Sequence, residues 1–573
     1  MTVVEGKSSS EVVPLLTLGS ALQLMAALLW IPQAWVLAVV IDAMAKQENV
    51  WETAVVCALW FIGLGLARAA LNAVGTRKSY LRARRSLTQM REEALDALSV
   101  RSPLDIERPT SGRIASALGE QAEMVVPYLS RYQPVRFKVM VVPVVMLAAV
   151  FYHSWVAALI LLCAAPLIPI FMVLIGFGAQ KASENQILEI GQMNGFLLDR
   201  LRGLSTIRAF DGVEMIAKRL REVSEEVRKK TMKVLSIAFL SSAVMELFSS
   251  LGVAMVAAYI GFHLLGEEFQ IGAWAGKMSL GQGMFILLLA PTFFDPLKEL
   301  SAVWHDRASG EAAMAALKEL QEKGTPLVGR KSHELHDSVF SGSAAGQELP
   351  VGALSVVAEN ICFRYPGAPQ NVLDHFNLHV QSGQKVALLA PSGYGKSTLL
   401  ALFAGLLPVT EGVVKVGGVL LDDDTADTLR TRMGWISQHP HVFAGTLLQN
   451  ITLGRQQIEE SQLEDAIQAS ALTNVAKRGL DRRLGEGASA GISGGEVLRL
   501  ALARAMATPD LGLLLADEPT AHLDSDTAQE VVDGLMLLAN QGVTLIVATH
   551  DERLLPYMDQ VIRLEEMYAR GQT

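Results

Sequence analysis

Long apolar segments recur through the first half of this 573-residue chain, and they constrain its fold more than any other feature. A helix needs about 20 apolar residues to cross the hydrocarbon core of a bilayer. The segments therefore predict six membrane-spanning helices in contact with lipid. They cover residues 16–43, 51–76, 135–153, 155–178, 235–265 and 279–300. The composition agrees, because only 19% of the residues are charged and 51% are hydrophobic, which is less charge than soluble domains usually carry.

The basic residues lie mainly in two long connections between these segments. Residues 77–134 and 179–234 are rich in Arg and Lys, whereas the short connections at 44–50 and 266–275 hold almost none. The positive-inside rule then places both long connections and both chain ends in the cytoplasm. Apolar residues recur at helical spacing in the long connections, so we expect cytoplasmic extensions of the membrane helices. Their hairpin tips would suit contact with a cytoplasmic domain.

The amino-acid composition of the chain changes after residue 320. Residues 321–353 are rich in Gly, Ser, Pro and charge without apolar periodicity, which is typical of a linker. The sequence therefore predicts a transmembrane domain at 1–320, this linker, and a soluble domain at 354–573. No basic tract indicates nucleic acid as a partner. The cysteines form no CxxC pair, and we interpret them as buried apolar residues: Cys57, Cys163 and Cys362.

A glycine-rich loop follows an apolar strand in KVALLAPSGYGKSTLL, residues 385–400. In such loops the backbone N–H groups and the following helix N-terminus bind phosphates. Lys396 would reach the β- and γ-phosphates of ATP, and Ser397 would ligate Mg²⁺. The first Gly of the usual pattern is Ala390 here, at a strand end where we expect a methyl group to be tolerated. The predicted phosphate-binding residues are Ala390, Pro391, Ser392, Gly393, Tyr394, Gly395, Lys396, Ser397 and Thr398.

Two further apolar strands end in residues suited to hydrolysis. LGLLLADEPTAHLD, residues 511–524, ends its strand at Asp517 and Glu518. Asp517 would hold Mg²⁺ through water, and Glu518 would act as the general base on the attacking water. His550 follows the strand of TLIVATHDE and would hold that water in line. Taken alone, the acidic pair also fits an ordinary exposed strand end, and a lone histidine is more often structural. Their order after a phosphate loop favours catalysis.

Other residues fit the same chemistry at other places. Gln438, in WISQHPHVF, is suited to sense Mg²⁺ and the attacking water. Tyr365, in FRYPG, could stack on adenine, although a plain strand aromatic is the alternative. Ser493, Gly494 and Gly495 open a helix, and such a turn is a second anion site. It lies far from the phosphate loop in sequence, so it can serve the ATP of a different molecule.

Together and in this order, these motifs resemble the ATP-binding-cassette family over residues 354–573. That resemblance implies a head-to-tail cassette dimer with ATP between one phosphate loop and the partner's signature turn at 492–496. Residues 165–179, 194–214 and 235–251 are similar to the CydD-type subunits of bacterial CydDC exporters. The implied fold is multidomain: an all-α six-helix transmembrane exporter domain and an α/β P-loop nucleotide-binding domain with a helical subdomain. The implied cofactors are ATP and Mg²⁺.

The CydD-type resemblance also implies a function. It predicts one half of a heterodimer with a CydC-like second half-transporter, in the bacterial cytoplasmic (inner) membrane. The small-molecule substrate would be cysteine, glutathione or haem, exported for cytochrome bd assembly. The alternatives are a homodimeric lipid or drug exporter and an ATP-gated membrane regulator, which the intact Glu518 and His550 disfavour. Within the fifth span, Glu246 is a candidate for the transport pathway, although charges in membranes are more often paired.

Overall fold

The computed structural model describes residues 17–47, 50–265, 272–274, 277–322, 324–329, 351–391, 393–455, 458–485, 491–521 and 523–565. The chain divides into two compact units. The helical unit consists of Met1–Arg91 and Ala115–Leu317, and the cassette unit consists of Glu92–Ile114 and Lys318–Thr573. The end of the helix Val50–Val100 and the residues that follow it, up to Ile114, therefore belong with the C-terminal half.

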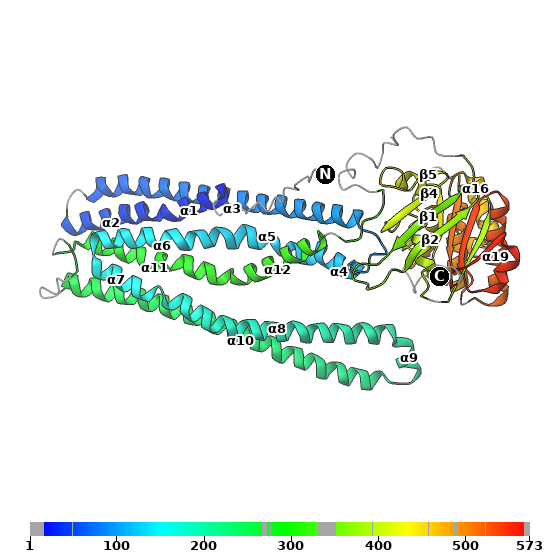
Figure 1. Ribbon diagram of the computed structural model, residues 1–573. Coiled ribbons are helices and arrows are strands. Elements are labelled where there is room, and N and C mark those ends of the chain that lie inside the picture. The colour runs from blue at the N-terminus through cyan, green and yellow to red at the C-terminus, as the bar shows by residue number, and fades with distance from the viewer. Residues whose placement is uncertain are drawn as a thin grey trace. The chain divides into compact units, whose positions relative to one another are not determined.

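Helices account for nearly all of the described part of the helical unit (Figure 1). The long ones are α1 (Leu18–Leu28), α2 (Trp30–Lys46), α3 (Val50–Val100), α6 (Gln133–His153), α7 (Trp155–Ala164), α8 (Leu167–Arg202), α10 (Val213–Leu265), α11 (Leu280–Ala302) and α12 (Trp304–Leu320). Shorter ones are α4 (Ser111–Ser116), α5 (Val125–Pro127) and α9 (Leu204–Ala209), with π-helical turns at Ala117–Gln121 and Tyr128–Tyr132.

The apolar helices coincide with the predicted spans. Within the described residues, five helical stretches are long and apolar enough to cross a membrane: Leu18–Lys46, Val50–Val100, Ser111–His153, Val213–Leu265 and Leu280–Leu320. The predicted span at 155–178 covers α7 and the start of α8, which meet at Pro166, and its described apolar stretch is Trp155–Phe171. The number of six spans stays a prediction.

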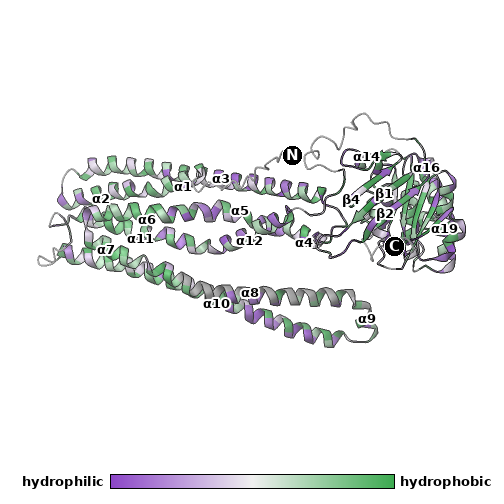
Figure 2. Ribbon diagram, viewed as in Figure 1, coloured by the Kyte–Doolittle hydropathy of each residue, from purple (hydrophilic) through white to green (hydrophobic). Residues whose placement is uncertain are grey.

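Two helices are much longer than a bilayer is thick. α3 has 51 residues and α10 has 53, so each is roughly 75–80 Å long at 1.5 Å per residue, against about 30 Å of hydrocarbon. Figure 2 shows α10 turning from hydrophobic to hydrophilic toward α9. The helices thus continue beyond the apolar segments and through the long basic connections. The helical spacing of apolar residues in those connections predicted such extensions.

The described part of the cassette unit contains three sheets. A five-stranded parallel sheet has the order β11-β3-β10-β9-β6, a four-stranded antiparallel sheet has the order β2-β1-β4-β5, and β7 pairs with β8. The strands are β1 (Val356–Phe363), β2 (Leu373–Val380), β3 (Lys385–Leu389), β4 (Glu411–Val416), β5 (Val419–Leu420), β6 (Met433–Ile436), β7 (Gly445–Thr446), β8 (Arg483–Leu484), β9 (Leu513–Asp517), β10 (Thr544–Thr549) and β11 (Gln560–Arg563).

Helices cover these sheets and build a separate small core. They are α13 (Lys396–Phe403), α14 (Ala426–Arg430), α15 (Leu447–Thr452), α16 (Glu460–Ala469), α17 (Thr473–Ala476), α18 (Gly494–Met506) and α19 (Ser525–Asn540). α13 shares one apolar core with β1–β4, whereas α15–α17 pack with one face of α18 around Leu447 and Leu500. The predicted α/β fold with a helical subdomain is confirmed.

The segment Glu92–Ile114 is anchored inside the cassette unit by specific bonds. The backbone N–H of Ser102 donates to the Thr325 carbonyl (2.9 Å), and its hydroxyl donates to the Leu406 carbonyl (2.5 Å). Arg101 forms an ion pair with Asp105 in which the side chains are only 6% and 1% exposed. The first hairpin tip therefore belongs to the cassette unit. The second tip, α9, lies in the helical unit, and its docking on a cassette stays a prediction.

Candidate nucleotide-binding site

The phosphate loop leaves the buried strand β3 and enters α13. Ala390 is buried in the core beneath the loop and is not among the described residues with a positive φ. A methyl group at this position therefore fits, as its place at the strand end predicts. Gly393 and Gly395 do take positive φ values of 91° and 82°, which L side chains rarely adopt. Ser392 lies outside the described residues.

Lys396 is held at the centre of this loop. Its Nζ donates to the carbonyls of Ala390 (2.5 Å) and Pro391 (3.3 Å) and lies 3.6 Å from Glu518 Oε1. Among the described residues, α13 has no side-chain cap at its N-terminus, so its first N–H groups are available to an anion. A buried ammonium, two left-handed glycines and an uncapped helix start fit the phosphates of ATP.

The carboxyl ends of β9 and β10 bring the predicted catalytic residues together. Because the strands are parallel neighbours, Ala548 lies opposite Asp517, and the next backbone N–H, of Glu518, donates to the Ala548 carbonyl (2.8 Å). Glu518 Oε2 then lies 3.0 Å from His550 Nδ1. The Glu518 side chain is 15% exposed and that of His550 is 66% exposed. Glu518 thus lies between the Lys396 ammonium and the histidine, where a general base could be oriented.

Asp517 lies deeper than Glu518, at the last position of β9. Burial raises the pKa of Asp517, and the neighbouring charge of Glu518 acts in the same direction. A hydrogen bond from Ser397 and the charge of Lys396 act in the opposite direction. The Ser397 hydroxyl and the Asp517 carboxylate are thus adjacent oxygen donors, the kind of ligand that Mg²⁺ prefers. Ser397 and Asp517, two of the three residues predicted as magnesium ligands, fit that role, and the third is Gln438.

A group that the sequence reasoning did not single out holds the two strand ends together. Thr520 Oγ1 donates to Asp551 Oδ2 (2.8 Å), and Arg553 binds the same carboxylate. The hydrogen bond from Arg553 is the main cause that lowers the pKa of Asp551 to about 2. These residues line an open pocket of about 310 Å³ with Glu518 and His550. The one signal in the sequence was their position directly after the catalytic strand ends.

Two other predicted residues lie around this site. Gln438 is exposed two residues beyond β6, and β6 pairs with β9 so that Ile436 lies opposite Ala516. Gln438 therefore follows the same sheet edge as Asp517. The Tyr365 hydroxyl lies 2.9 Å from Thr398 Oγ1 on α13. This bond ties the predicted adenine-stacking residue to the phosphate-loop helix.

The signature turn has its own local structure. Ser493 caps α18, since its hydroxyl accepts from the Glu496 N–H (3.2 Å) and its N–H donates to Glu496 Oε2 (2.7 Å). Gly495 lies so close to Thr527 of α19 that a Cβ would be 2.6 Å from the threonine methyl. Ser493 and Gly494 are exposed. The turn thus packs against α19 and presents its start to solvent.

The membrane candidate Glu246 is paired. Its Oε2 lies 2.8 Å from the Nζ of Lys298 on α11, and Ser250 donates to its Oε1. A structural ion pair was the alternative to a role in the transport pathway, because unpaired charges are scarce in membranes.

The cassette unit combines a phosphate loop, an acidic strand end, a histidine and a signature turn. Together with the long apolar helices, these features define an ATP-binding-cassette exporter subunit. The family model of the ABC transporter transmembrane region matches residues 16–297, and that of the ABC transporter matches residues 373–521. A bacterial Atm1-family ABC exporter with ATP bound shares the fold, with a TM-score of 0.66 at 20% identity, over 97% of this chain and 98% of that one.

Curated relatives refine this class. The transport ATP-binding protein AarD of Providencia stuartii is 33% identical over 549 residues, 95% of this chain and 90% of AarD. The glutathione/L-cysteine transport system ATP-binding/permease protein CydD of Escherichia coli is 34% identical over 539 residues, 93% of this chain and 88% of CydD. The chain belongs to the CydD/AarD-type family of ATP-binding-cassette exporters. It is a multi-pass membrane protein that binds ATP and couples its hydrolysis to transport.

Proposed function

We propose that this chain is the CydD-like half of a heterodimeric exporter that moves cysteine or glutathione out of the bacterial cytoplasm. The observation that carries the proposal is Glu518, held between Lys396 and His550 in a chain with CydD-type relatives along most of its length. The relatives named for glutathione/L-cysteine transport support the thiol substrate. Transport of haem and a role in cytochrome bd assembly remain predictions from the resemblance.

Each residue of the site would have a defined part in ATP hydrolysis. Lys396, the loop backbone and the start of α13 would bind the phosphates. Ser397, Asp517 and Gln438 would hold Mg²⁺, which would supply neutralisation of the phosphate charge. Glu518 would accept a proton from the attacking water, and His550, 3.0 Å away, would keep its carboxylate in place.

The partner subunit follows from the signature turn. Ser493 and Gly494 are exposed at the start of α18, where backbone N–H groups could meet an anion on a facing molecule. The CydC protein of Bacillus subtilis, named for the same kind of transport system, is 28% identical over 514 residues, 88% of this chain and 84% of CydC. We therefore propose a CydC-like partner whose phosphate loop faces this turn.

The orientation rests on the basic connections. The Arg- and Lys-rich residues 77–134 and 179–234 would stay in the cytoplasm with the cassette and the N-terminus. Ser102 and Asp105, in the first of these connections, form one bonded group with Thr325 within the cassette unit. We propose that this group transmits cassette closure to α3.

The test is transport by the assembled pair. The chain and its CydC-like partner are co-expressed, and inside-out membrane vesicles are supplied with ATP and labelled glutathione, cysteine or haem. We expect ATP-dependent uptake of a thiol only when both subunits are present. Uptake of haem alone, or full thiol uptake by this chain without the partner, would contradict the proposal.

A further inference from the structure

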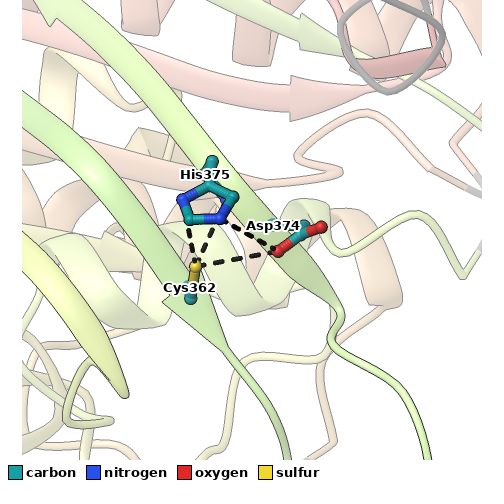
Figure 3. A group of neighbouring side chains, drawn as sticks. All are labelled: Cys362, Asp374 and His375. Carbon is teal, nitrogen blue, oxygen red and sulfur yellow. Dashed lines mark hydrogen bonds and ion pairs between the residues drawn. The ribbon is translucent and has the colours of Figure 1, made fainter. Parts of the chain in front are cut away.

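Three side chains that bind metals elsewhere in proteins meet on the hairpin formed by β1 and β2. Cys362 lies near the end of β1, and Asp374 and His375 lie near the start of β2. One ligand atom from each lies within 4.8 Å of the others. Figure 3 shows all three side chains pointing toward one another. The group lies outside the nucleotide-binding residues described above.

The sulfur of Cys362 and the carboxylate of Asp374 are already spaced as around a tetrahedral ion. Cys362 Sγ lies 3.7 Å from Asp374 Oδ1 and 3.8 Å from His375 Nδ1, and His375 Nε2 lies 4.0 Å from Asp374 Oδ1. Zinc bonds of about 2.3 Å to sulfur and about 2.0–2.2 Å to nitrogen and oxygen put neighbouring ligands roughly 3.3–3.7 Å apart. The Sγ–Oδ1 distance already lies close to that range. The exposed His375 ring would have to move by about 1 Å to bring Nε2 into it.

Hydrogen bonds from neighbouring groups orient His375 and Cys362. Asn360 Oδ1 lies 2.7 Å from His375 Nδ1; a carbonyl oxygen there favours a proton on Nδ1 and leaves Nε2 free as the ligand, the usual arrangement around metal-bound histidines. The backbone N–H of His375 donates to Cys362 Sγ (3.3 Å). This bond fixes the position of the sulfur next to the histidine.

The strand pairing explains why consecutive residues share one site. The register between β1 and β2 shifts between Ala358 and Ile361 and again before Phe363. At this irregularity His375 and Asn360 both take positive φ values, 48° and 53°. Bulges re-aim side chains, and here Asp374 and His375 both come close to Cys362 instead of pointing to opposite faces.

Access to the site comes from one side. Cys362 is 4% exposed, whereas the side chains of Asp374 and His375 are each 63% exposed. A cysteine sulfur beneath a solvent-facing carboxylate and imidazole is a mixed sulfur, nitrogen and oxygen ligand set, which suits borderline-soft divalent cations. We propose that Cys362, Asp374 and His375 bind one Zn²⁺-type ion, with water as the fourth ligand. The ion would join β1 to β2 three residues before Tyr365.

Cobalt spectroscopy on the full-length chain tests the proposal. The detergent-solubilised protein is stripped with a chelator and titrated with Co²⁺, and then with Zn²⁺. We expect one equivalent of Co²⁺ to give tetrahedral d–d bands and a thiolate charge-transfer band, and Zn²⁺ to abolish both. Cys362→Ser removes the charge-transfer band, and His375→Gln weakens Co²⁺ binding at least tenfold.

The other thiols provide the matched control. Cys57 on α3 and Cys163 on α7 have no place in the cluster, so the Cys57→Ser, Cys163→Ser double variant should retain both bands. Nucleotide binding, measured on every variant, reports that the cassette is folded. A wild-type chain without the charge-transfer band overturns the site, and so does a band that persists in Cys362→Ser or is lost in the double control.

Discussion

The buried ion pair between Arg101 and Asp105 gives the strongest quantitative prediction. Asp105 accepts hydrogen bonds from Arg101 Nε, from the Glu107 N–H (3.1 Å), and from the N–H and hydroxyl of Thr325 (3.2 and 3.3 Å). Burial alone would raise the pKa of Asp105, but the bonds from Arg101 and Glu107 outweigh it and lower this pKa. The Asp105→Asn variant keeps the shape of the side chain and removes its charge.

The free-energy cost of Asp105→Asn follows from the burial of both Asp105 and Arg101. Removing one member of a buried ion pair leaves the other charge uncompensated and costs about 3–5 kcal/mol. Because the pair anchors Glu92–Ile114 within the cassette unit, this cost falls on local opening of that segment. At about 1.4 kcal/mol per factor of ten, opening becomes roughly 100- to 5,000-fold more frequent.

Hydrogen exchange followed by mass spectrometry measures this opening. The reporter amides are those of Ser102, which donates to Thr325, and Leu327, which donates to Val100. We expect both to exchange faster in Asp105→Asn by the factor above. The control is Glu359→Gln, which breaks the exposed Lys415–Glu359 pair and should change exchange around it by less than about tenfold. Equal exchange in Asp105→Asn and wild type would refute the anchoring role.

Two further predictions concern the nucleotide site. Gly395→Ala places a side chain at φ 82° and a Cβ 2.9 Å from Val372. Because an L residue in the left-handed region costs about 1–2 kcal/mol, ATP affinity should fall by about tenfold or more in a fluorescent-nucleotide titration. The control Gly418→Ala, at φ 80° in open space, should leave the affinity unchanged. The pKa of Asp551 is lowered to about 2, so its stabilising contribution is complete at neutral pH and is lost as the pH falls from about 4 toward 2. Thermal unfolding of Asp551→Asn between pH 7 and 3 should therefore show a weaker acid dependence than wild type, and identical curves would contradict this.

Residues at strand ends could be placed from the sequence because parallel strands bring their carboxyl ends to one edge. Asp517, Glu518 and His550 each follow an apolar strand, and β9 and β10 are neighbours in the sheet. The glycines at 393 and 395 were likewise predictable, since a loop that wraps phosphate needs a backbone free of side chains.

Residues joined by irregular or long-range pairing could not be placed in this way. The Cys362 group depends on a strand irregularity near Asn360, and no periodicity in the sequence encodes a bulge. The expectation that all three cysteines are buried is met by Cys362 only, because Cys163 is exposed on α7 and Cys57 is half-buried on α3. The assignment of residues 92–114 to the cassette unit depends on bonds to Thr325 and Leu406, which lie more than 200 positions away.

The proposed transport cycle depends on hydrolysis of ATP by Glu518 in an assembled two-subunit exporter. The decisive measurement is the ATPase rate of the purified pair carrying Glu518→Gln, with ATP binding measured on the same sample. We predict that binding persists while the Glu518-dependent rate falls by about 10²–10⁴-fold, the usual contribution of a general base. Glu464→Gln, on the exposed face of α16, should hydrolyse ATP at the wild-type rate. A Glu518→Gln pair that hydrolyses ATP and transports like the wild type would contradict the account.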